Sequence, residues 1–548
     1  MLGLSVFLWD NDCSDCKVGT ATKLFRGIAL NGQDPSELSR SHTVVARREC
    51  VATVGVLQAP ILHCAGTSRL RRGEVAMTRR PVGSSTRVQK PMIVRVWAIA
   101  VVVAVAIAGC AAPGATTVAP PPAVAAATVP STTVPPTTMP ATAVSTTAPS
   151  AAATPIKIGV ISILEGPFAG LGEQGIWGVK LALIEAGGKL EGSGPFDQVA
   201  GATAGGRPIE LFVESSDGSP DKALAAAKIL IERDQVDVLV GPLSGDEGIA
   251  LKSYAEQHLD KTFISGAVSS QDLTLRDAAP NYFRFGTDGP QMADGLGKYA
   301  YQTMGLRNVA TIGEDYSFPY DQVGAFVYEF CQAGGNIVDR NWVPMGTTDY
   351  AASITRIPKA ADGLVVVLSG TDAVDFLKSL ANSPRAGMPV IGGAVTVDPS
   401  LIASLGKLAE GIVSGSPVAV LSTPEYLAYA KLLKETFPGS QDPGLNDVAY
   451  YTGTKSLLMG LDQVGGDLSN GQAKLKAALA VLKWTTPTGP ISLDKNRSGI
   501  ANTFITKVVN GQKQVIQTNE QVNEWLGMPE DQYLKVGPFS RTNPPCTH

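Results

Sequence analysis

Short apolar runs and helix-spaced apolar positions follow one another along the chain from residue 155 onward. Residues 156–164 form a nearly continuous apolar run, which is typical of a strand covered on both faces in a parallel sheet. Behind this run, Ile176, Val179 and Leu183 recur at the i, i+3 and i+7 spacing of a helix. We predict that this helix begins near Glu173 and stops at the pair of glycines that follows it.

The same alternation of strand and helix continues to the end of the chain. Further strands are expected at 209–214, 236–240, 262–265, 309–312, 336–343, 364–369, 390–392 and 412–416, with a hairpin of 491–493 and 503–509. Further helices are expected at 219–234, where Ser219 is the predicted N-cap, and at 247–258, 323–333, 350–358, 372–381, 426–437, 447–464 and 473–482. Two consecutive runs of alternating strands and helices predict an α/β fold with two similar parallel-sheet lobes.

A glycine-rich stretch, EGPFAGLGEQG, is predicted to be a loop between the first strand and the first helix. Within it, Gly170, Gly172 and Gly175 have the G-x-G-x-x-G spacing of dinucleotide-binding sites. That fingerprint opens directly off its strand, whereas residues 165–169 intervene here, and the next predicted strand lies too far along the chain to supply its acidic residue. The hypothesis that the protein is a nucleotide-dependent α/β enzyme is therefore the least favoured.

Residues 1–91 differ from the rest of the chain. They carry patches of arginine and little hydrophobic periodicity, so we expect a disordered or wrongly assigned N-terminal extension, with translation starting at Met77 or Met92. Cys13 and Cys16 have the spacing of a zinc knuckle, but the later cysteine and histidine spacings fit no standard zinc site.

Residues 92–110 have the layout of a signal peptide. Basic residues precede the apolar run 96–108, which is too short to cross a bilayer as a helix and has the length of a signal-peptide core. The run ends in Ile107-Ala108-Gly109-Cys110, which resembles the lipobox of bacterial lipoproteins. The resemblance implies cleavage before Cys110 and lipidation of that cysteine.

Residues 111–154 contain no charged residue and consist almost wholly of Ala, Thr, Pro, Ser and Val. A segment of this composition cannot bury enough apolar surface to fold, and its prolines favour an extended polyproline conformation. We expect a linker that holds the folded part away from its anchor.

Composition argues against several classes of function. A net charge of −4 and a pI near 5.7 give no basic surface for nucleic acid. Within 155–548 the histidines are His258 and the terminal His548, and no serine has a G-x-S-x-G context. Two cysteines in that region are too few for a usual catalytic zinc site. We therefore expect no enzyme activity, no catalytic residue, no metal and no cofactor.

Several stretches, taken in order, carry a resemblance to a known family: IKIGVISILEGPFAGLGEQ, ESSDGSPDKALAAAKILIERDQVDVLVGP, FISGAVSSQDLT, FRFGTDGPQMADGLGKY and EDYSF. Residues 155 to about 520 resemble the type 1 solute-binding proteins of ABC transporters, in the leucine/isoleucine/valine-binding branch. This implies two doubly wound lobes joined by crossovers near residues 286, 415 and 487. The first lobe would comprise 155–286 and 416–487, and the second 287–415 and 488–548.

The resemblance also implies a function. We expect a monomer, lipid-anchored at the outer face of the cytoplasmic membrane, that captures a branched-chain amino acid or a related carboxylate or amide in its interlobe cleft. It would deliver this ligand to the transmembrane subunits of an ABC permease. The alternative is a surface receptor of the same fold that is not coupled to a permease.

The candidate ligand-binding residues lie where strands end, because open α/β sheets bind ligands at the carboxyl ends of their strands. By resemblance, Ser269 would donate to a ligand carboxylate, and the carbonyl of Ala267 would accept from an ammonium group. The expected set is Phe168, Leu171, Ser244, Gly245, Ala267, Val268, Ser269, Phe318, Thr371 and Ala394.

One departure from the family pattern concerns the ligand's ammonium group. Amino-acid binders usually place a carboxylate of the second lobe against it, but this chain has Ala394 and Val395 at about that position. Asp315 and Asp398 are the remaining candidates. If neither reaches the ligand, an unpaired buried ammonium would cost several kcal/mol, so a carboxylate without the amine, or an amide, is then expected.

Cys331 and Cys546 are the two thiols of residues 155–548. In an oxidising compartment they are candidates for a disulfide that ties the C-terminal tail to the helix around residue 331. The alternative is one buried thiol and one free thiol in the tail.

Overall fold

The computed structural model describes residues 154–546 together with five short strands near the N-terminus. The chain divides into two compact units, Met1–Pro136 and Thr137–His548. In the first unit, strands pair antiparallel in the order β1-β4-β3 and, separately, β2-β5. These strands are β1 (Ser5–Leu8), β2 (Lys17–Gly19), β3 (His42–Ala46), β4 (Cys50–Gly55) and β5 (Ile61–His63). The expected signal peptide with Cys110, and the linker up to residue 153, lie outside the described residues.

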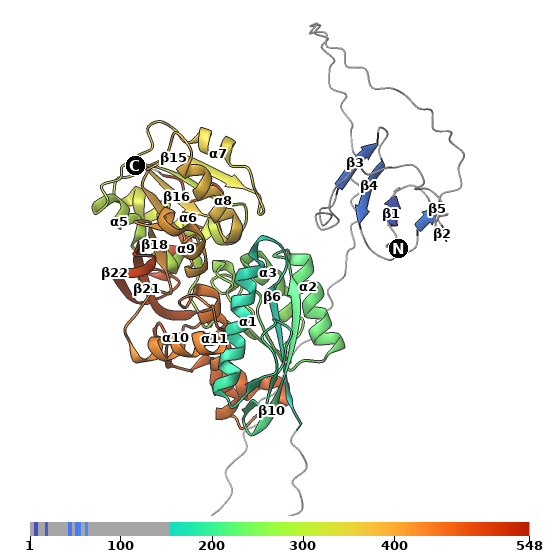
Figure 1. Ribbon diagram of the computed structural model, residues 1–548. Coiled ribbons are helices and arrows are strands. Elements are labelled where there is room, and N and C mark those ends of the chain that lie inside the picture. Colours follow the sequence, from blue (N-terminus) through green and yellow to red (C-terminus); the bar gives the residue numbers. More distant parts are fainter. Residues whose placement is uncertain are drawn as a thin grey trace, which may run out of the picture. The chain divides into compact units, whose positions relative to one another are not determined.

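The first lobe of the second unit is built on a six-stranded sheet in the order β13-β12-β11-β6-β10-β9 (Figure 1). Its strands are β6 (Ile156–Ile163), β9 (Thr203–Ala204), β10 (Arg207–Ser216), β11 (Val238–Val240), β12 (Thr262–Ile264) and β13 (Tyr282–Phe283). All neighbours pair parallel except β9 and β10. Apolar residues of β6 are buried on both faces, as the sequence predicts for a covered parallel strand.

Helices cover both faces of this sheet. Helices α2 (Pro220–Lys228) and α3 (Gly245–Ala255) share an apolar core with Ile161 and Phe263 on one face. On the other face α1 (Ala169–Glu185) packs against α11 (Leu445–Gln463), so a late segment of the chain completes the first lobe.

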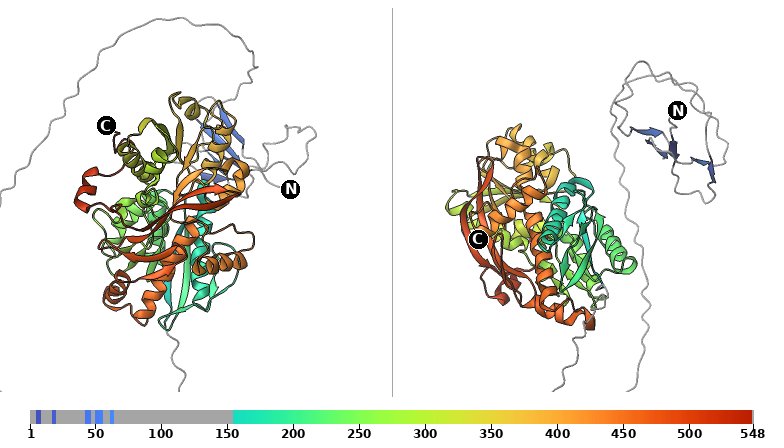
Figure 2. Two further views of the ribbon diagram at one scale, coloured as in Figure 1. Left: turned by 90° about the vertical axis from the view of Figure 1, so that its left-hand side faces the viewer. Right: turned by 60° about the horizontal axis from the view of Figure 1, so that its bottom comes forward.

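The second lobe is built on a nine-stranded sheet in the order β15-β14-β16-β17-β18-β21-β20-β19, with β22 paired to β21. Its strands are β14 (Asn308–Glu314), β15 (Asn336–Val343), β16 (Gly363–Val367), β17 (Val390–Gly392), β18 (Val413–Ser416), β19 (Trp484–Thr486), β20 (Gly489–Leu493), β21 (Gly499–Val509) and β22 (Gln512–Val522). β14 to β18 pair parallel and the later strands antiparallel. In both views of Figure 2 these last strands, drawn in red, lie beside the earlier elements of this lobe.

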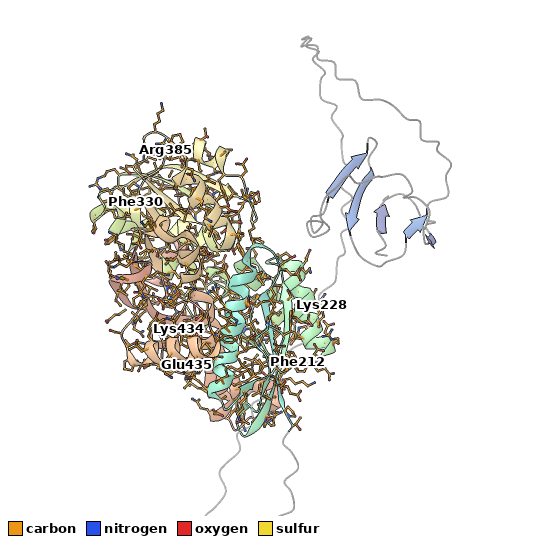
Figure 3. The ribbon with its side chains drawn as sticks, viewed as in Figure 1. Phe212, Lys228, Phe330, Arg385, Lys434 and Glu435 are labelled. Atoms are coloured by element: carbon orange, nitrogen blue, oxygen red, sulfur yellow. A yellow bond between two sulfur atoms is a disulfide. The ribbon has the colours of Figure 1, made fainter. Side chains whose placement is uncertain are left out.

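Helices also surround the second sheet. They are α4 (Gly289–Met292), α5 (Leu296–Gln302), α6 (Ser317–Gln332), α7 (Ala351–Arg356), α8 (Gly370–Ala381) and α9 (Pro399–Leu405). Phe330 of α6, labelled in Figure 3, is fully buried and stacks on Phe326 with ring centroids 5.3 Å apart. The strand-and-helix alternation predicted from the sequence is thus confirmed, and the fold is α/β with two doubly wound lobes.

In the described residues, the chain passes between the two sheets at 284–288, at 417–423 and at 481–483. The first segment runs from β13 to α4, the second from β18 to α10 (Pro424–Thr436), and the third from α12 (Ser469–Ala480) to β19. The first is anchored by Arg284, which is 1% exposed and donates to the carbonyl of Ser270 at 2.7 Å and to Glu524 at 2.8 Å. None of the helices in the part of the chain that the structure describes is long and apolar enough to cross a bilayer.

Helix α6 begins at Ser317, six residues before the predicted start at Val323, and two further predicted elements differ from the structure. Helix α1 begins at Ala169 and not near Glu173, so most of the glycine-rich stretch is helical and not a loop. A Cβ at Gly172 would lie 1.6 Å from the carbonyl oxygen of Ile163, and one at Gly178 would lie 2.1 Å from that of Asp447. At both positions, glycine allows α1 to approach β6 and α11 closely.

The second difference concerns the predicted hairpin of 491–493 and 503–509. Strand β20 pairs with the start of β21, where Leu493 faces Gly499. Residues 504–507 of β21 pair instead with β18, and the end of β21 forms a hairpin with β22, which the sequence analysis did not predict. The N-cap at Ser219 is confirmed, because its side chain accepts from the main-chain N–H of Lys222.

The C-terminal tail is tied to the second lobe. A disulfide joins Cys331 of α6 to Cys546, with Cα atoms 5.5 Å apart, so the sequence-based candidate pair is bonded. Phe539 of the tail packs against Gly324, where a Cβ would lie 2.5 Å from its ring. Arg541 forms an ion pair with Asp315.

Candidate ligand-binding site

A cavity lies between the lobes where the strands of both sheets end at their carboxyl edges. The empty space within it is about 360 Å³, of which part is continuous with solvent. The loops after β6, β11 and β12 form the wall from the first lobe, the loops after β14, β16 and β17 form the wall from the second, and the start of α11 closes one side. The lining residues are Phe168, Leu171, Leu243, Ser244, Gly245, Ala267, Ser269, Tyr316, Phe318, Ser369, Val395, Leu445 and Asn446.

Five helices begin at this cavity. The N-caps of α1, α3, α6 and α8 are Phe168, Ser244, Tyr316 and Ser369, and all four line it. Helix α11 begins at Leu445, which also lines it. Because the first N–H groups of a helix lack intrahelical partners and carry the positive end of its dipole, these ends together favour a negatively charged group in the cavity.

Neutral polar groups supply directed hydrogen bonds. Asn446 is 1% exposed, and its Nδ2 group has no hydrogen-bond partner among the described residues. The Oγ of Ser269 donates to the carbonyl oxygen of Ala267 at 2.9 Å. Ser244 caps α3 and donates to the carbonyl of Gly218 at 3.3 Å. The amide of Asn446 is therefore a buried donor available to a ligand acceptor.

None of the residues that line the cavity is charged. A buried acid behind the wall is Glu314, which accepts from the main-chain N–H of Ser369 at 2.6 Å and from its hydroxyl at 3.3 Å. Burial raises the pKa of Glu314 well above its usual range. Glu314 therefore serves to hold Ser369, the N-cap of α8, in place.

The two candidates for an ammonium partner lie elsewhere. Asp315 accepts from Tyr320 and pairs with Arg541 beside the C-terminal tail. Asp398 caps α9, where it accepts from the N–H of Ser400 at 3.1 Å and from its hydroxyl at 2.7 Å. Neither aspartate lines the cavity.

The structure brings together seven of the ten residues singled out in the sequence, namely Phe168, Leu171, Ser244, Gly245, Ala267, Ser269 and Phe318. Val268 packs in the apolar core of the first lobe. Thr371 is exposed on α8. Ala394 is fully buried behind the wall, where its N–H donates to Gln322 at 3.1 Å, and its neighbour Val395 lines the cavity instead.

Sequence reasoning missed six lining residues, which are Leu243, Tyr316, Ser369, Val395, Leu445 and Asn446. Leu243, Tyr316 and Ser369 lie one or two positions from residues that were considered, and Val395 was named only as a departure from the family pattern. Leu445 and Asn446 carry a different signal, because they open a long helix and the N-terminal ends of helices gather at ligand sites in this architecture.

The lobes contact each other at the mouth of the cavity. The main-chain N–H of Ser317 in the second lobe donates to Asp246 in the first at 3.2 Å. A Cβ at Gly370 would lie 2.4 Å from the carbonyl oxygen of Pro167 in the opposite lobe. The lobes therefore meet beside the cavity, and their separation would widen it.

Comparisons with known proteins agree with this geometry. A family model described as "Periplasmic binding protein" matches residues 155–513. Among curated proteins, Leu/Ile/Val-binding protein homolog 6 of Brucella melitensis is 24% identical over 365 residues, which cover 65% of this chain and 88% of the relative.

Two solved structures are similar over the whole of their own length. The ABC transporter substrate-binding protein from Sphaerobacter thermophilus is 28% identical, with a TM-score of 0.60 and coverage of 68% of this chain and 99% of its own. A solute binding protein of an ABC transporter from Rhodopseudomonas palustris BisB5, in complex with 3,4-dihydroxybenzoic acid, is 27% identical, with a TM-score of 0.60 and coverage of 67% and 98%.

Proposed function

This chain belongs to the periplasmic binding protein family, and on that premise we propose that it is the substrate-binding component of an ABC importer. Its ligand is a small organic carboxylate with an apolar or aromatic body and no free α-ammonium group. The carboxylate lies among the helix N-termini of the interlobe cavity, and the body lies against the apolar wall.

The character of the cavity lining carries this proposal. Neutral donors and the positive ends of five helices suit an anion, whereas no lining side chain is acidic. An ammonium group would have to leave water without a carboxylate partner, and that desolvation costs several kcal/mol. The same cavity therefore favours a carboxylate over the zwitterion of the same carbon skeleton.

Aromatic walls support a ring as the body of the ligand. Phe168 of the first lobe and Tyr316 of the second have ring centroids 6.4 Å apart, and Tyr316 and Phe318 are 6.3 Å apart. Rings in offset or tilted arrangements at such separations attract one another, and a ligand ring can join them. The similar protein from Rhodopseudomonas palustris BisB5 was solved with 3,4-dihydroxybenzoic acid, so benzoic acids are the first class to test.

Capture follows from movement about the three segments that join the lobes. Opening would break the Ser317–Asp246 contact and expose the cavity, and ligand binding would favour the arrangement in which both walls contact the ligand. A permease that recognises the closed lobes would receive only loaded protein.

The proposal about the protein's cellular location rests on residues 92–154. Signal peptidase cleavage before Cys110, lipidation of that cysteine and an extended linker would hold the folded lobes at the outer face of the cytoplasmic membrane. In a bacterial host, the Cys110→Ala variant should lose incorporation of an alkyne-labelled fatty acid and leave the membrane fraction. Equal labelling of this variant and the parent protein would contradict the anchor.

A thermal-shift screen of residues 155–548 tests the ligand class, because a ligand that binds only the folded state raises Tm by mass action. The screen contains benzoates and aliphatic carboxylates, their amides and the amino acids with matching skeletons. We expect shifts with carboxylates and loss of these shifts in Asn446→Leu, which removes the buried donor. Asn382→Leu, at an exposed position of the second lobe, is the control. Shifts confined to amino acids would contradict the proposal.

A further inference from the structure

A second cavity lies beside the segments that join the lobes, and it shares Ala267, Ser269 and Leu445 with the ligand cavity described above. The empty space within it is about 520 Å³, of which part is continuous with solvent. Two of the joining segments, 284–288 and 417–423, contribute to its wall, together with the end of β19, the loop after β12 and one face of α11. We call it the hinge cavity, and its lining residues are Ser265, Gly266, Ala267, Val268, Ser269, Arg284, Phe285, Gly286, Thr287, Met292, Pro417, Val418, Leu445, Val448, Ala449, Thr452, Thr486, Thr488, Ile491, Ala501 and Asn502.

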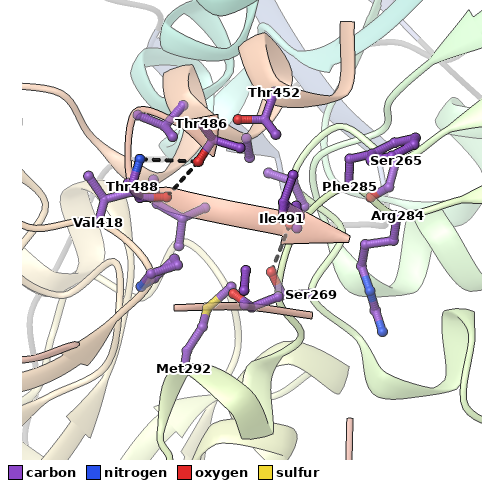
Figure 4. Close-up of a pocket in the computed structure, with 18 of the residues that line it drawn as sticks. Ser265, Ser269, Arg284, Phe285, Met292, Val418, Thr452, Thr486, Thr488 and Ile491 are labelled. Atoms are coloured by element: carbon purple, nitrogen blue, oxygen red, sulfur yellow. Dashed lines mark hydrogen bonds between the residues drawn. The ribbon is translucent and has the colours of Figure 1, made fainter. Parts of the chain in front are cut away.

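The wall of the hinge cavity is mainly apolar and offers no free charge. Phe285, Met292, Val418 and Ile491 surround the space in Figure 4. Arg284 is the one charged residue of this wall, and Figure 4 shows its side chain directed away from the others. Its guanidinium donates to the carbonyl of Ser270, to Ser498 and to Glu524. An occupant of this cavity is therefore uncharged.

A buried hydroxyl in the wall, that of Thr287, has no partner within the described part of the chain. The Oγ1 of Thr287 has no hydrogen bond among the described residues, although the residue is only 5% exposed. Thr486 of the same wall differs, since its Oγ1 accepts from the N–H of Thr488 at 3.1 Å and donates to the carbonyl of Gly489 at 2.8 Å. A buried hydroxyl without a partner is unfavourable, so Thr287 favours an occupant with one hydrogen-bonding group.

There is also empty space beside Gly286, the residue before Thr287. A Cβ placed on Gly286 meets no heavy atom within 4 Å. The rim of the cavity near Pro417, Thr488 and Asn502 is partly exposed and gives a route to solvent. The hinge cavity therefore has a polar anchor, an apolar body and an entrance, which are the features of a small-molecule site.

We propose that the hinge cavity is a second binding site, for an uncharged, mainly apolar molecule that carries one hydroxyl or carbonyl group. The group pairs with Thr287, and the body packs between Phe285 of the first lobe and Ile491 of the second. Since the joining segments move relative to one another when the lobes open, an occupant that fits this arrangement favours the closed lobes. This site does not depend on which ligand the interlobe cavity takes.

The probe for the test is benzyl alcohol, which has a ring and one hydroxyl. Its binding to residues 155–548 is followed by chemical shifts in an NMR titration. Gly286→Leu fills the hinge cavity, Thr287→Val removes the hydroxyl at nearly constant volume, and Leu171→Phe fills only the interlobe cavity. We expect saturable binding that falls at least tenfold in Gly286→Leu and roughly fivefold in Thr287→Val, as for loss of one buried hydrogen bond, and that persists in Leu171→Phe.

Three results would overturn the proposal. They are no saturable binding, equal affinity in the parent protein and in Gly286→Leu, or loss of binding only in Leu171→Phe, which would place the probe in the interlobe cavity. The crystal structure of the parent protein soaked in benzyl alcohol tests the proposed site without any variant. Ring density beside Thr287 supports the site, and ordered water alone in the hinge cavity contradicts it.

Discussion

The hydroxyl of Ser269 donates to the carbonyl oxygen of Ala267 across 2.9 Å, inside the interlobe cavity. These are the two groups that the family resemblance assigns to the carboxylate and the ammonium group of a ligand. In the structure they satisfy each other, so neither is left without a partner when no ligand is bound. Rotation about the Cα–Cβ bond of Ser269 would let its hydroxyl donate to a ligand carboxylate instead.

Ser269→Ala should therefore weaken carboxylate binding about tenfold or more, because a hydrogen bond to a charged group contributes roughly 1.5–3 kcal/mol. Isothermal titration measures the affinity, and circular dichroism should show unchanged folding. Ser404→Ala, at an exposed position of α9, is the control and should bind like the parent protein. Unchanged affinity in Ser269→Ala would remove this residue from the site.

Gly370→Ala should hinder closure of the lobes, since its Cβ would meet the carbonyl oxygen of Pro167 across the cleft. We expect ligand affinity to fall at least tenfold, and small-angle scattering to show no compaction on adding ligand. The positive φ of 53° adds backbone strain of about 1 kcal/mol. Gly387→Ala, with a φ of 81° and no neighbour within 4 Å of its Cβ, carries similar strain without the contact. Equal losses of affinity in the two variants would refute the steric explanation.

Stability should decrease as pH rises from about 5 to 8. Burial raises the pKa of Asp447 to about 8, whereas the same carboxyl in the unfolded chain titrates near 4. The folded state therefore holds an extra proton in this window, and its free energy of unfolding falls by at most about 1.4 kcal/mol per pH unit from this group. Burial raises the pKa values of Glu247 and Glu314 and acts in the same direction.

Urea denaturation at pH 5, 6.5 and 8 measures this dependence. Asp447→Asn should show a shallower decline than the parent protein, because the neutral amide does not titrate. Asp531→Asn, at an exposed position, is the control and should leave the slope unchanged. A slope in Asp447→Asn as steep as that of the parent protein would show that another group dominates.

Reduction of the Cys331–Cys546 disulfide should release the C-terminal tail, because the bond closes a loop between residues 215 positions apart. We expect faster cleavage of the tail by a protease after reduction, and a free energy of unfolding lower by about 2–4 kcal/mol. The Cys331→Ser, Cys546→Ser double variant is the control and should not respond to reductant. Equal cleavage of the parent protein with and without reductant would mean that contacts such as that of Phe539 hold the tail alone.

The fold could be predicted where local pattern and tertiary structure agree. The apolar run of β6 and the cap at Ser219 are local signals, and both appear in the structure. The start of α1 could not be predicted, because the low helix propensity of glycine is outweighed by the close approach of α1 to β6 at Gly172. The hairpin of β21 and β22 has a local signal that the sequence analysis did not use, because Asn510 and Gly511, with φ of 52° and 75°, form its two-residue turn.

The candidate site divides in the same way. Ser269 and Phe168 follow strand ends that the sequence marks, so their side of the cavity could be inferred. Asn446 comes from a helix that returns to the first lobe after the chain has built most of the second, and its place is set by the packing of α11 against α1. That Asp398 caps α9 and does not line the cavity likewise depends on how the lobes are assembled, so the sequence alone could not predict it.

The central claim is that the interlobe cavity selects a carboxylate and rejects the matching amino acid. The most direct measurement is isothermal titration of residues 155–548 with two matched pairs, 4-methylpentanoate against leucine and 3-phenylpropanoate against phenylalanine. The structure predicts that the member without the amine binds at least tenfold more tightly in any pair that binds, because no carboxylate lines the cavity to receive the ammonium group. Tighter binding of leucine or phenylalanine than of its deaminated partner would contradict the account.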